Sequence, residues 1–343
     1  MKKVSAFLRP MTRPAMAILA VCTVAGATLV PVEANAFQLY DDERFHLEVR
    51  AFGEVQYSVQ REPEDGDIAQ GVRINMARAQ AVFTHKQIGG LMVQFEGRNQ
   101  AAELIDMTVS FTGVRNLELR GGYFRTGLHL EAQTPLPFIL FNDRSSVVNN
   151  GVFRKWGAEA LYMPAVGDTR LTFQAGLFNP TQNGESFDLG QLLMARASAT
   201  FENGITVHVA ATEHVFAANQ NPETGVPILA HDHLIDAAVA WQNDGWQAHV
   251  EGLTSVKTES NAGELVMYSH VAHRFELPGP DIEPKLRFDY IDRDGVVTEQ
   301  GYAGVNMYLA QDHNVIASLD YRGTDRDHSL SHAVILTLQA GVW

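Results

Sequence analysis

Apolar and polar side chains alternate along the chain from Arg44 to Gln60, RFHLEVRAFGEVQYSVQ, where Phe52 is the single apolar residue on the polar side. A period of two over this length predicts one long β-strand with two unlike faces. Strands of soluble proteins average about five or six residues, so this length favours a strand that crosses a bilayer at a tilt. We expect lipid to contact Phe45, Leu47, Val49 and Val55, and water to contact Glu48, Arg50, Glu54 and Gln56.

The same alternation recurs down the chain, and each segment is bounded by Gly, Pro, Asn or Asp residues typical of turns. Clear examples are residues 205–212 and 246–253. The pattern predicts an all-β fold, a transmembrane antiparallel up-and-down β-barrel of sixteen strands, with short turns at one end and longer loops at the other. The strands are expected to begin near residues 44, 72, 89, 102, 117, 155, 169, 191, 205, 233, 245, 264, 284, 300, 313 and 330. The longer loops are expected at residues 60–71, 126–154, 179–190, 215–232, 257–263, 292–299 and 323–329.

The first 36 residues have the pattern of a secretory signal peptide. Lys2 and Lys3 begin a basic start, residues 15–30 are apolar, and Ala34-Asn35-Ala36 is a small-x-small cleavage sequence. The apolar run is too short for a typical membrane anchor, so we expect cleavage after Ala36. Residues 37–343 then form the barrel domain, and the expected location is the cell outer membrane.

Removal of residues 1–36 leaves 22 basic and 39 acidic residues, a net charge of −17. This charge argues against a nucleic-acid-binding surface and against a protein that attracts anions over its whole surface. The mature chain has no cysteine, since Cys22 lies in the signal peptide, and this excludes thiol chemistry. No later stretch approaches the roughly 20 apolar residues of a membrane helix, so a membrane location requires a barrel.

A secreted β-sandwich is the main alternative fold, because it also has alternating strands and frequent turns. The polar face of the predicted strands favours the barrel, since it carries many Arg, Glu, His and Gln residues, as a wet lumen would. Aromatic residues also occur near strand ends, where a bilayer interface enriches Tyr and Trp. They are Tyr57, Tyr123, Trp156, Tyr162, Trp241, Trp246 and Tyr321.

The connection 126–154 is the longest in the chain, at 29 residues, and it is too apolar for simple disorder. Its apolar residues need a surface to pack on, and an inward fold against the barrel wall would bury them and narrow the pore. Such a constriction loop would place cationic side chains opposite carboxylates. The electric field across the pore would then orient and sort polar solutes. The cations are Arg125, Arg144, Arg154 and Lys155, and the carboxylates are Glu131 and Asp143. These arginines could equally anchor the loop, and the two roles are compatible.

The polar faces of the other strands predict a pore wall of mixed charge. Arg50, Arg78, Arg98 and Arg120 are expected to line the pore, together with Glu48, Glu54, Glu96, Glu118, Glu159 and Asp236. Selectivity is set by the charges at the narrowest point, so the negative net charge weakens a preference for anions without excluding it.

The segment from Gly121 to Tyr162 resembles the phosphate-selective porins (the porin O and P family) of Gram-negative outer membranes. The matching residues are Gly122, Phe124, Arg125, Leu130, Glu131, Thr134, Phe141, Asp143, Arg144 and Arg154 to Gly157. Thr126-Gly127 replaces the x-Pro of that family, and a lysine-rich vestibule is missing. The resemblance implies a sixteen-stranded, trimeric porin, possible anion substrates such as phosphate, and contact with outer-membrane lipid and lipopolysaccharide.

Enzymatic and metal-binding motifs are absent from the sequence. Neither a Gly-x-Ser-x-Gly turn nor a His-Glu-x-x-His helix occurs, so we expect no enzymatic activity and no catalytic residue. The cluster His231-Asp232-His233 is interpreted as a solvated loop end, and residues 292–295 as a turn, so no metal site and no cofactor are expected. The predicted function is passive diffusion of small hydrophilic solutes or ions, with an adhesive or structural barrel and a barrel hydrolase as alternatives.

Overall fold

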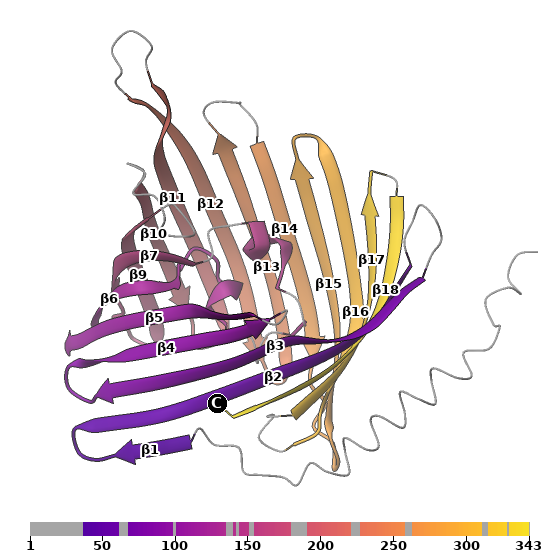
Figure 1. Ribbon diagram of the computed structural model, residues 1–343, viewed down its shortest axis with the longest axis horizontal. Coiled ribbons are helices and arrows are strands. Elements are labelled where there is room, and N and C mark those ends of the chain that lie inside the picture. Colours follow the sequence, from indigo (N-terminus) through magenta and orange to yellow (C-terminus); the bar gives the residue numbers. More distant parts are fainter. Residues whose placement is uncertain are drawn as a thin grey trace, which may run out of the picture. The chain divides into compact units, whose positions relative to one another are not determined.

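The computed structural model describes residues 37–61, 68–98, 101–134, 140–141, 144–150, 154–179, 191–220, 227–257, 263–310, 315–327 and 329–342 (Figure 1). The predicted signal peptide and its cleavage site after Ala36 lie outside these residues. Among the described residues, sixteen long strands form one antiparallel sheet that closes on itself. Closure joins β2, the first long strand, to β18, the last.

The long strands are β2 (Phe45–Arg61), β3 (Ile68–His85), β4 (Gly89–Arg98), β5 (Ala101–Val114), β6 (Leu117–Arg125), β7 (Arg154–Tyr162), β9 (Thr169–Phe178), β10 (Gln191–Thr200), β11 (Ile205–Gln220), β12 (Pro227–Asn243), β13 (Trp246–Lys257), β14 (Gly263–His273), β15 (Asp281–Arg293), β16 (Val296–Tyr308), β17 (Val315–Arg326) and β18 (Ser329–Val342). Two short strands, β1 (Phe37–Asp41) and β8 (Ala165–Val166), pair with β2 and β9. The predicted closed barrel of sixteen long strands is confirmed.

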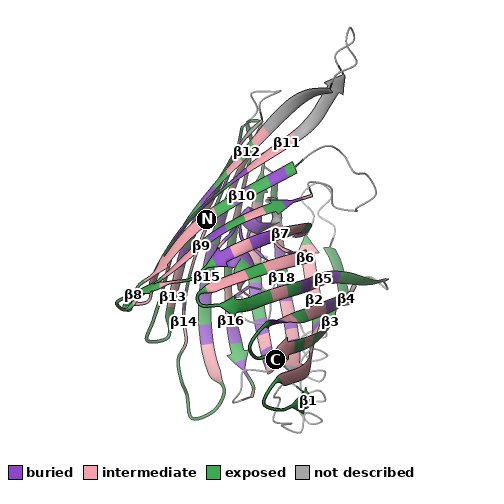
Figure 2. Cartoon of the chain, turned by 90° about the vertical axis from the view of Figure 1, so that its left-hand side faces the viewer, coloured by how far each residue is buried: buried purple, intermediate pink, exposed green. Residues whose placement is uncertain are grey.

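Each strand has one apolar face and one polar face, and Figure 2 shows buried and exposed residues alternating along many strands. In β13, Val250 is 52% exposed, whereas the neighbouring Glu251 is fully buried. In β2, Glu54 and Gln56 are buried and Val55 is exposed, as the sequence predicts. An apolar outer face of this extent is untypical of a soluble monomer, because water would contact it, and it suits a lipid environment.

Tyr and Trp side chains lie on the outside near strand ends. Tyr162 at the end of β7, Trp241 near the end of β12 and Trp246 at the start of β13 are all exposed. These rings occupy the positions at which amphipathic aromatic side chains contact a membrane interface. The outer face therefore agrees with a membrane barrel at its rim as well as along its strands.

Several connections are shorter than the sequence indicates. The expected loop 292–299 is a turn at Asp294 and Gly295, both with positive φ, as an Asp-Gly hairpin turn requires. The expected loops 60–71, 215–232 and 323–329 shorten likewise, because β3 begins at Ile68, β12 at Pro227, and β17 extends to Arg326. In these hairpins, backbone pairing continues past the residues whose apolar side chains face outward. Alternation of apolar and polar side chains is no longer required there, so the sequence pattern did not indicate these strand ends.

Candidate pore constriction

The segment between the end of β6 and the start of β7 folds into the lumen. Its described parts include a short 3-10 helix, η1 (Glu131–Gln133), and a one-turn helix, α2 (Ser146–Asn150). Helix α2 lies against β13, β14 and β15, across the ring from β6 and β7 (Figure 1). Leu128, His129 and Val147 are fully buried. The prediction of an inward-folded loop is confirmed over the described part of the segment.

Apolar contacts hold this loop to the far wall. Leu128 and Val147 belong to one buried cluster with Leu253, Val266 and Tyr268 of β13 and β14. The Phe141 ring packs edge-on against Tyr302 at 5.8 Å between ring centroids, and Lys285 Nζ lies 4.7 Å from its centroid. The apolar residues Leu136, Phe138, Ile139 and Phe153, also expected to pack, lie outside the described residues.

Polar side chains of the wall also bind the loop backbone, which must satisfy its donors and acceptors once it leaves water. Lys285 Nζ donates to the Leu140 carbonyl at 2.7 Å, and Arg287 Nη2 donates to the Arg144 carbonyl at 3.1 Å. Asp289 accepts hydrogen bonds from the amide and the hydroxyl of Ser146, at 3.1 and 2.7 Å. These bonds fix the segment that carries the predicted site residues.

Two of the predicted arginines hold the loop from within. Arg125 donates to the carbonyls of Ala132 and Thr134, and Arg144 donates to those of Glu131 and Thr134, both at 2.8 Å. Burial lowers the pKa of Arg144 to about 10, which leaves its guanidinium charged at neutral pH. The Glu131 carboxylate accepts from the Ser145 amide at 2.9 Å.

The remaining residues predicted for the constriction lie on strand β7 or outside the described residues. Arg154, at the start of β7, pairs with Asp106 of β5 at 3.1 Å. Lys155 is buried on β7, where the next residue, Trp156, is exposed. Asp143 lies outside the described residues, and so does the side chain of Arg98, although Arg98 itself ends β4.

A cavity of about 920 Å³ lies between the loop and the wall formed by β2 to β10. Three of the residues predicted to line the pore, Arg50, Arg78 and Arg120, do line it, and so do Arg125 and Arg196. Its charged lining is five arginines against three carboxylates, Asp106, Glu118 and Glu159. Arg120 pairs with Glu118 at 2.7 Å and with Glu159 at 3.4 Å. The lining residues by themselves carry a formal excess of two positive charges, while Arg50 and Arg78 are also paired with Glu48 and Glu96 beside the lining.

A second cavity, of about 570 Å³, lies along the wall that includes β10 to β14. Glu131, His249 and His270 line it, and Gln133 of η1 lines both cavities. The loop thus divides the lumen into a side rich in arginine and a side that contains histidine and glutamate. A solute in the larger space meets guanidinium, amide and hydroxyl groups together with three carboxylates.

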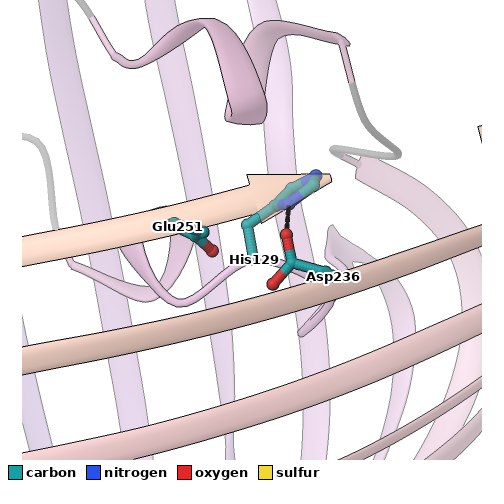
Figure 3. A group of neighbouring side chains, drawn as sticks. All are labelled: His129, Asp236 and Glu251. Atoms are coloured by element: carbon teal, nitrogen blue, oxygen red, sulfur yellow. Dashed lines mark hydrogen bonds and ion pairs between the residues drawn. The ribbon is translucent and has the colours of Figure 1, made fainter. Parts of the chain in front are cut away.

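A buried group of histidine and carboxylate side chains was not singled out as a site by the sequence. His129 Nδ1 of the loop donates to Asp236 Oδ2 of β12 at 2.9 Å, and Glu251 of β13 lies beside them (Figure 3). His208 of β11 donates from Nε2 to the Leu128 carbonyl at 2.7 Å. The alternation does place His208, Asp236 and Glu251 on polar faces, but it cannot show which part of the loop meets them.

No protein-family model matches the chain, and no curated protein matches it. Solved structures of similar fold include an anion-selective porin from Comamonas acidovorans, with a TM-score of 0.66 at 10% identity over 87% of this chain and 99% of that one. The outer membrane channel DcaP of Acinetobacter baumannii has a TM-score of 0.60 at 10% identity, over 89% of this chain and 99% of that one. The trimer form of OmpT, an outer membrane protein of Vibrio cholerae, gives 0.58 at 12% identity, over 87% and 99%. The chain thus has the barrel fold of Gram-negative outer-membrane porins. Within the described residues, no helix is long and apolar enough to span a bilayer.

Proposed function

We propose that this chain is an outer-membrane porin, a water-filled channel through which small hydrophilic solutes diffuse, with a preference for small anions. The observation that carries the proposal is the docked loop, which leaves a 920 Å³ lumen cavity whose charged lining is five arginines and three carboxylates. An anion entering this space replaces part of its hydration by guanidinium and amide donors, whereas a cation meets excess positive charge.

The arginines of the wall differ in how far nearby carboxylates compensate their charge. Arg78 donates from Nε to Glu96 at 2.6 Å, and Arg154 pairs with Asp106, so part of the positive charge is compensated on the wall itself. Arg125 and Arg196 also donate to loop carbonyls, those of Ala132 and Gly127, which carry no formal charge. The positive charge that attracts an anion in this proposal is therefore local to the lining, and it is compatible with the acidic composition of the chain.

The remaining parts of the proposal concern export, location and assembly. We propose export by a signal peptide cleaved after Ala36, insertion in the outer membrane in contact with lipid and lipopolysaccharide, and assembly as a homotrimer. The likeness to an outer membrane channel supports the location, and the likeness to the trimer form of an outer membrane protein supports the homotrimer. Phosphate is a candidate substrate among small anions, as the resemblance of residues 121–162 implies. No cofactor and no enzymatic step are needed.

Conductance across a planar lipid bilayer tests the proposal. Purified protein should form open channels, and the reversal potential in a KCl gradient should show that chloride permeates more readily than potassium. Added phosphate should reduce the chloride current if the same cavity binds it. A barrel without conductance would support the adhesive or structural alternative, and a channel selective for cations would refute the anion preference.

A further inference from the structure

The group of His129, Asp236 and Glu251 brings together three side chains from three elements: the constriction loop, β12 and β13 (Figure 3). One potential metal-ligating atom from each residue lies within 4.8 Å of the other two. All three residues are buried, and the side chains of His129 and Asp236 are fully inaccessible to solvent. Residues far apart in the sequence thus converge on one small enclosed volume.

The charges of this group call for a cation. Asp236 and Glu251 place two carboxylates in a buried position, where negative charge is costly unless it is balanced, and His249 Nε2 lies 3.3 Å from Glu251 Oε2. Among the described residues, Asp236 Oδ1 has no hydrogen-bond partner, and His208 Nε2 lies 3.5 Å from it. Neutral imidazole cannot balance two carboxylates, whereas a divalent ion would balance both.

The surroundings hold the group in place. The Glu251 carboxylate accepts from the amides of Leu130 at 2.6 Å and Glu131 at 3.3 Å, directly after His129 in the loop. On the other side, His208 binds the Leu128 carbonyl, and the Ser198 hydroxyl lies 3.0 Å from His208 Nδ1. The backbone that carries His129 is therefore fixed at both neighbours.

We propose that His129, Asp236 and Glu251 bind one divalent transition-metal ion, of which Zn²⁺ is the probe, and that this ion fastens the constriction loop to β12 and β13. One imidazole and two carboxylates suit zinc and its neighbours, whereas magnesium and calcium prefer oxygen ligands alone. Metal–ligand bonds of about 2.0–2.2 Å require the three atoms to move inward by roughly 1 Å. The proton on His129 Nδ1 moves to Nε2, or leaves if the ring is protonated, and Nδ1 then binds the ion.

Isothermal titration calorimetry of the full-length, detergent-solubilised barrel with Zn²⁺ tests this site, after dialysis against a chelator. The wild type should bind one ion per chain. Asp236→Asn and His129→Gln keep the size of each side chain, and each should weaken binding by about tenfold or more. Circular dichroism checks that both variants remain folded. With Co²⁺ in place of Zn²⁺, the visible absorption should show nitrogen ligation that is lost in His129→Gln.

Matched variants decide between this site and other histidines. His46 lies between Asp41 and Glu48, with one ring nitrogen 3.3 Å from each carboxylate, so His46→Gln should bind Zn²⁺ like the wild type. His233→Gln tests the His231-Asp232-His233 cluster on β12. The proposal is overturned if the wild type binds no Zn²⁺, or if Asp236→Asn binds normally while His233→Gln does not. Conductance in chelator is a separate measurement, so loss of the metal site and loss of the channel can be distinguished.

Discussion

Replacement of Arg125 by glutamine removes one positive charge from the larger lumen cavity and keeps a side chain able to donate to the loop. A sphere of 920 Å³ has a radius of about 6 Å, which approximates the distance from an ion at its centre to a charged group in the wall. In water, one charge at this distance contributes about 0.7 kcal/mol, and screening at 0.1 M salt reduces it to about 0.4 kcal/mol. That energy changes the local concentration of an anion about twofold and that of a cation about twofold in the opposite direction. The ratio of chloride to potassium permeability should therefore fall about fourfold in Arg125→Gln.

Reversal potentials of single channels in a KCl gradient measure this ratio directly. Arg144→Gln is the matched control, because Arg144 also donates to the Thr134 carbonyl but does not line the cavity. If both variants shift the ratio equally, loop anchoring is the common cause. An unchanged ratio in Arg125→Gln, with normal conductance, would refute the electrostatic argument. The effect should also shrink as the salt concentration rises, since the screening length shortens.

Three further predictions concern packing, lipid contact and turn geometry. Phe141→Ala should weaken loop docking by about 3 kcal/mol, seen as faster trypsin cleavage in the loop and noisier current, whereas Phe95→Ala on the exposed face should leave both unchanged. Val250→Lys should lower the free energy of unfolding in urea by about 2–4 kcal/mol if this face contacts lipid, and Val250→Leu should not. Gly295→Ala should lower the free energy of unfolding by about 1 kcal/mol in the same assay, because a φ of 82° is strained for a residue with a side chain. Gly279→Ala is the control, because both sites have space for a methyl group and only Gly295 has a positive φ.

The strand pattern was predictable because a bilayer imposes a strict alternation on both faces. The apolar Val250 of β13 is exposed and the polar Glu251 beside it is buried, so polarity along the strand predicts which residues face the lumen. The ends of the hairpins were less predictable. Beyond the bilayer, water contacts both faces of a strand, so alternation of apolar and polar side chains is not required there. The starts of β3 at Ile68 and of β12 at Pro227 therefore could not be predicted from the side-chain pattern.

The site was predictable in its parts but not in its contacts. The length and apolar character of residues 126–154 indicate an inward loop, and polar faces indicate lumen residues such as Arg78 and Arg120. No local pattern shows that His129 meets Asp236, 107 positions further along the chain. That contact depends on which wall the loop reaches, and this is set by packing of Phe141 and Val147 against β13 to β16 as a whole.

The pairing of β2 with β18 has a consequence for assembly. Arg61 lies opposite His332 and Ala51 opposite Val342, so the first long strand finds one of its two neighbours only among the last residues of the chain. Until that neighbour arrives, both strands present unpaired backbone groups, which are unfavourable in lipid and prone to pair with other chains. Ring closure is thus the step with the longest sequence separation, and it makes insertion depend on delivery of the complete chain in an unaggregated state. Loss of β18 would leave two open edges at once, so a truncated chain is expected to aggregate rather than to form a smaller channel.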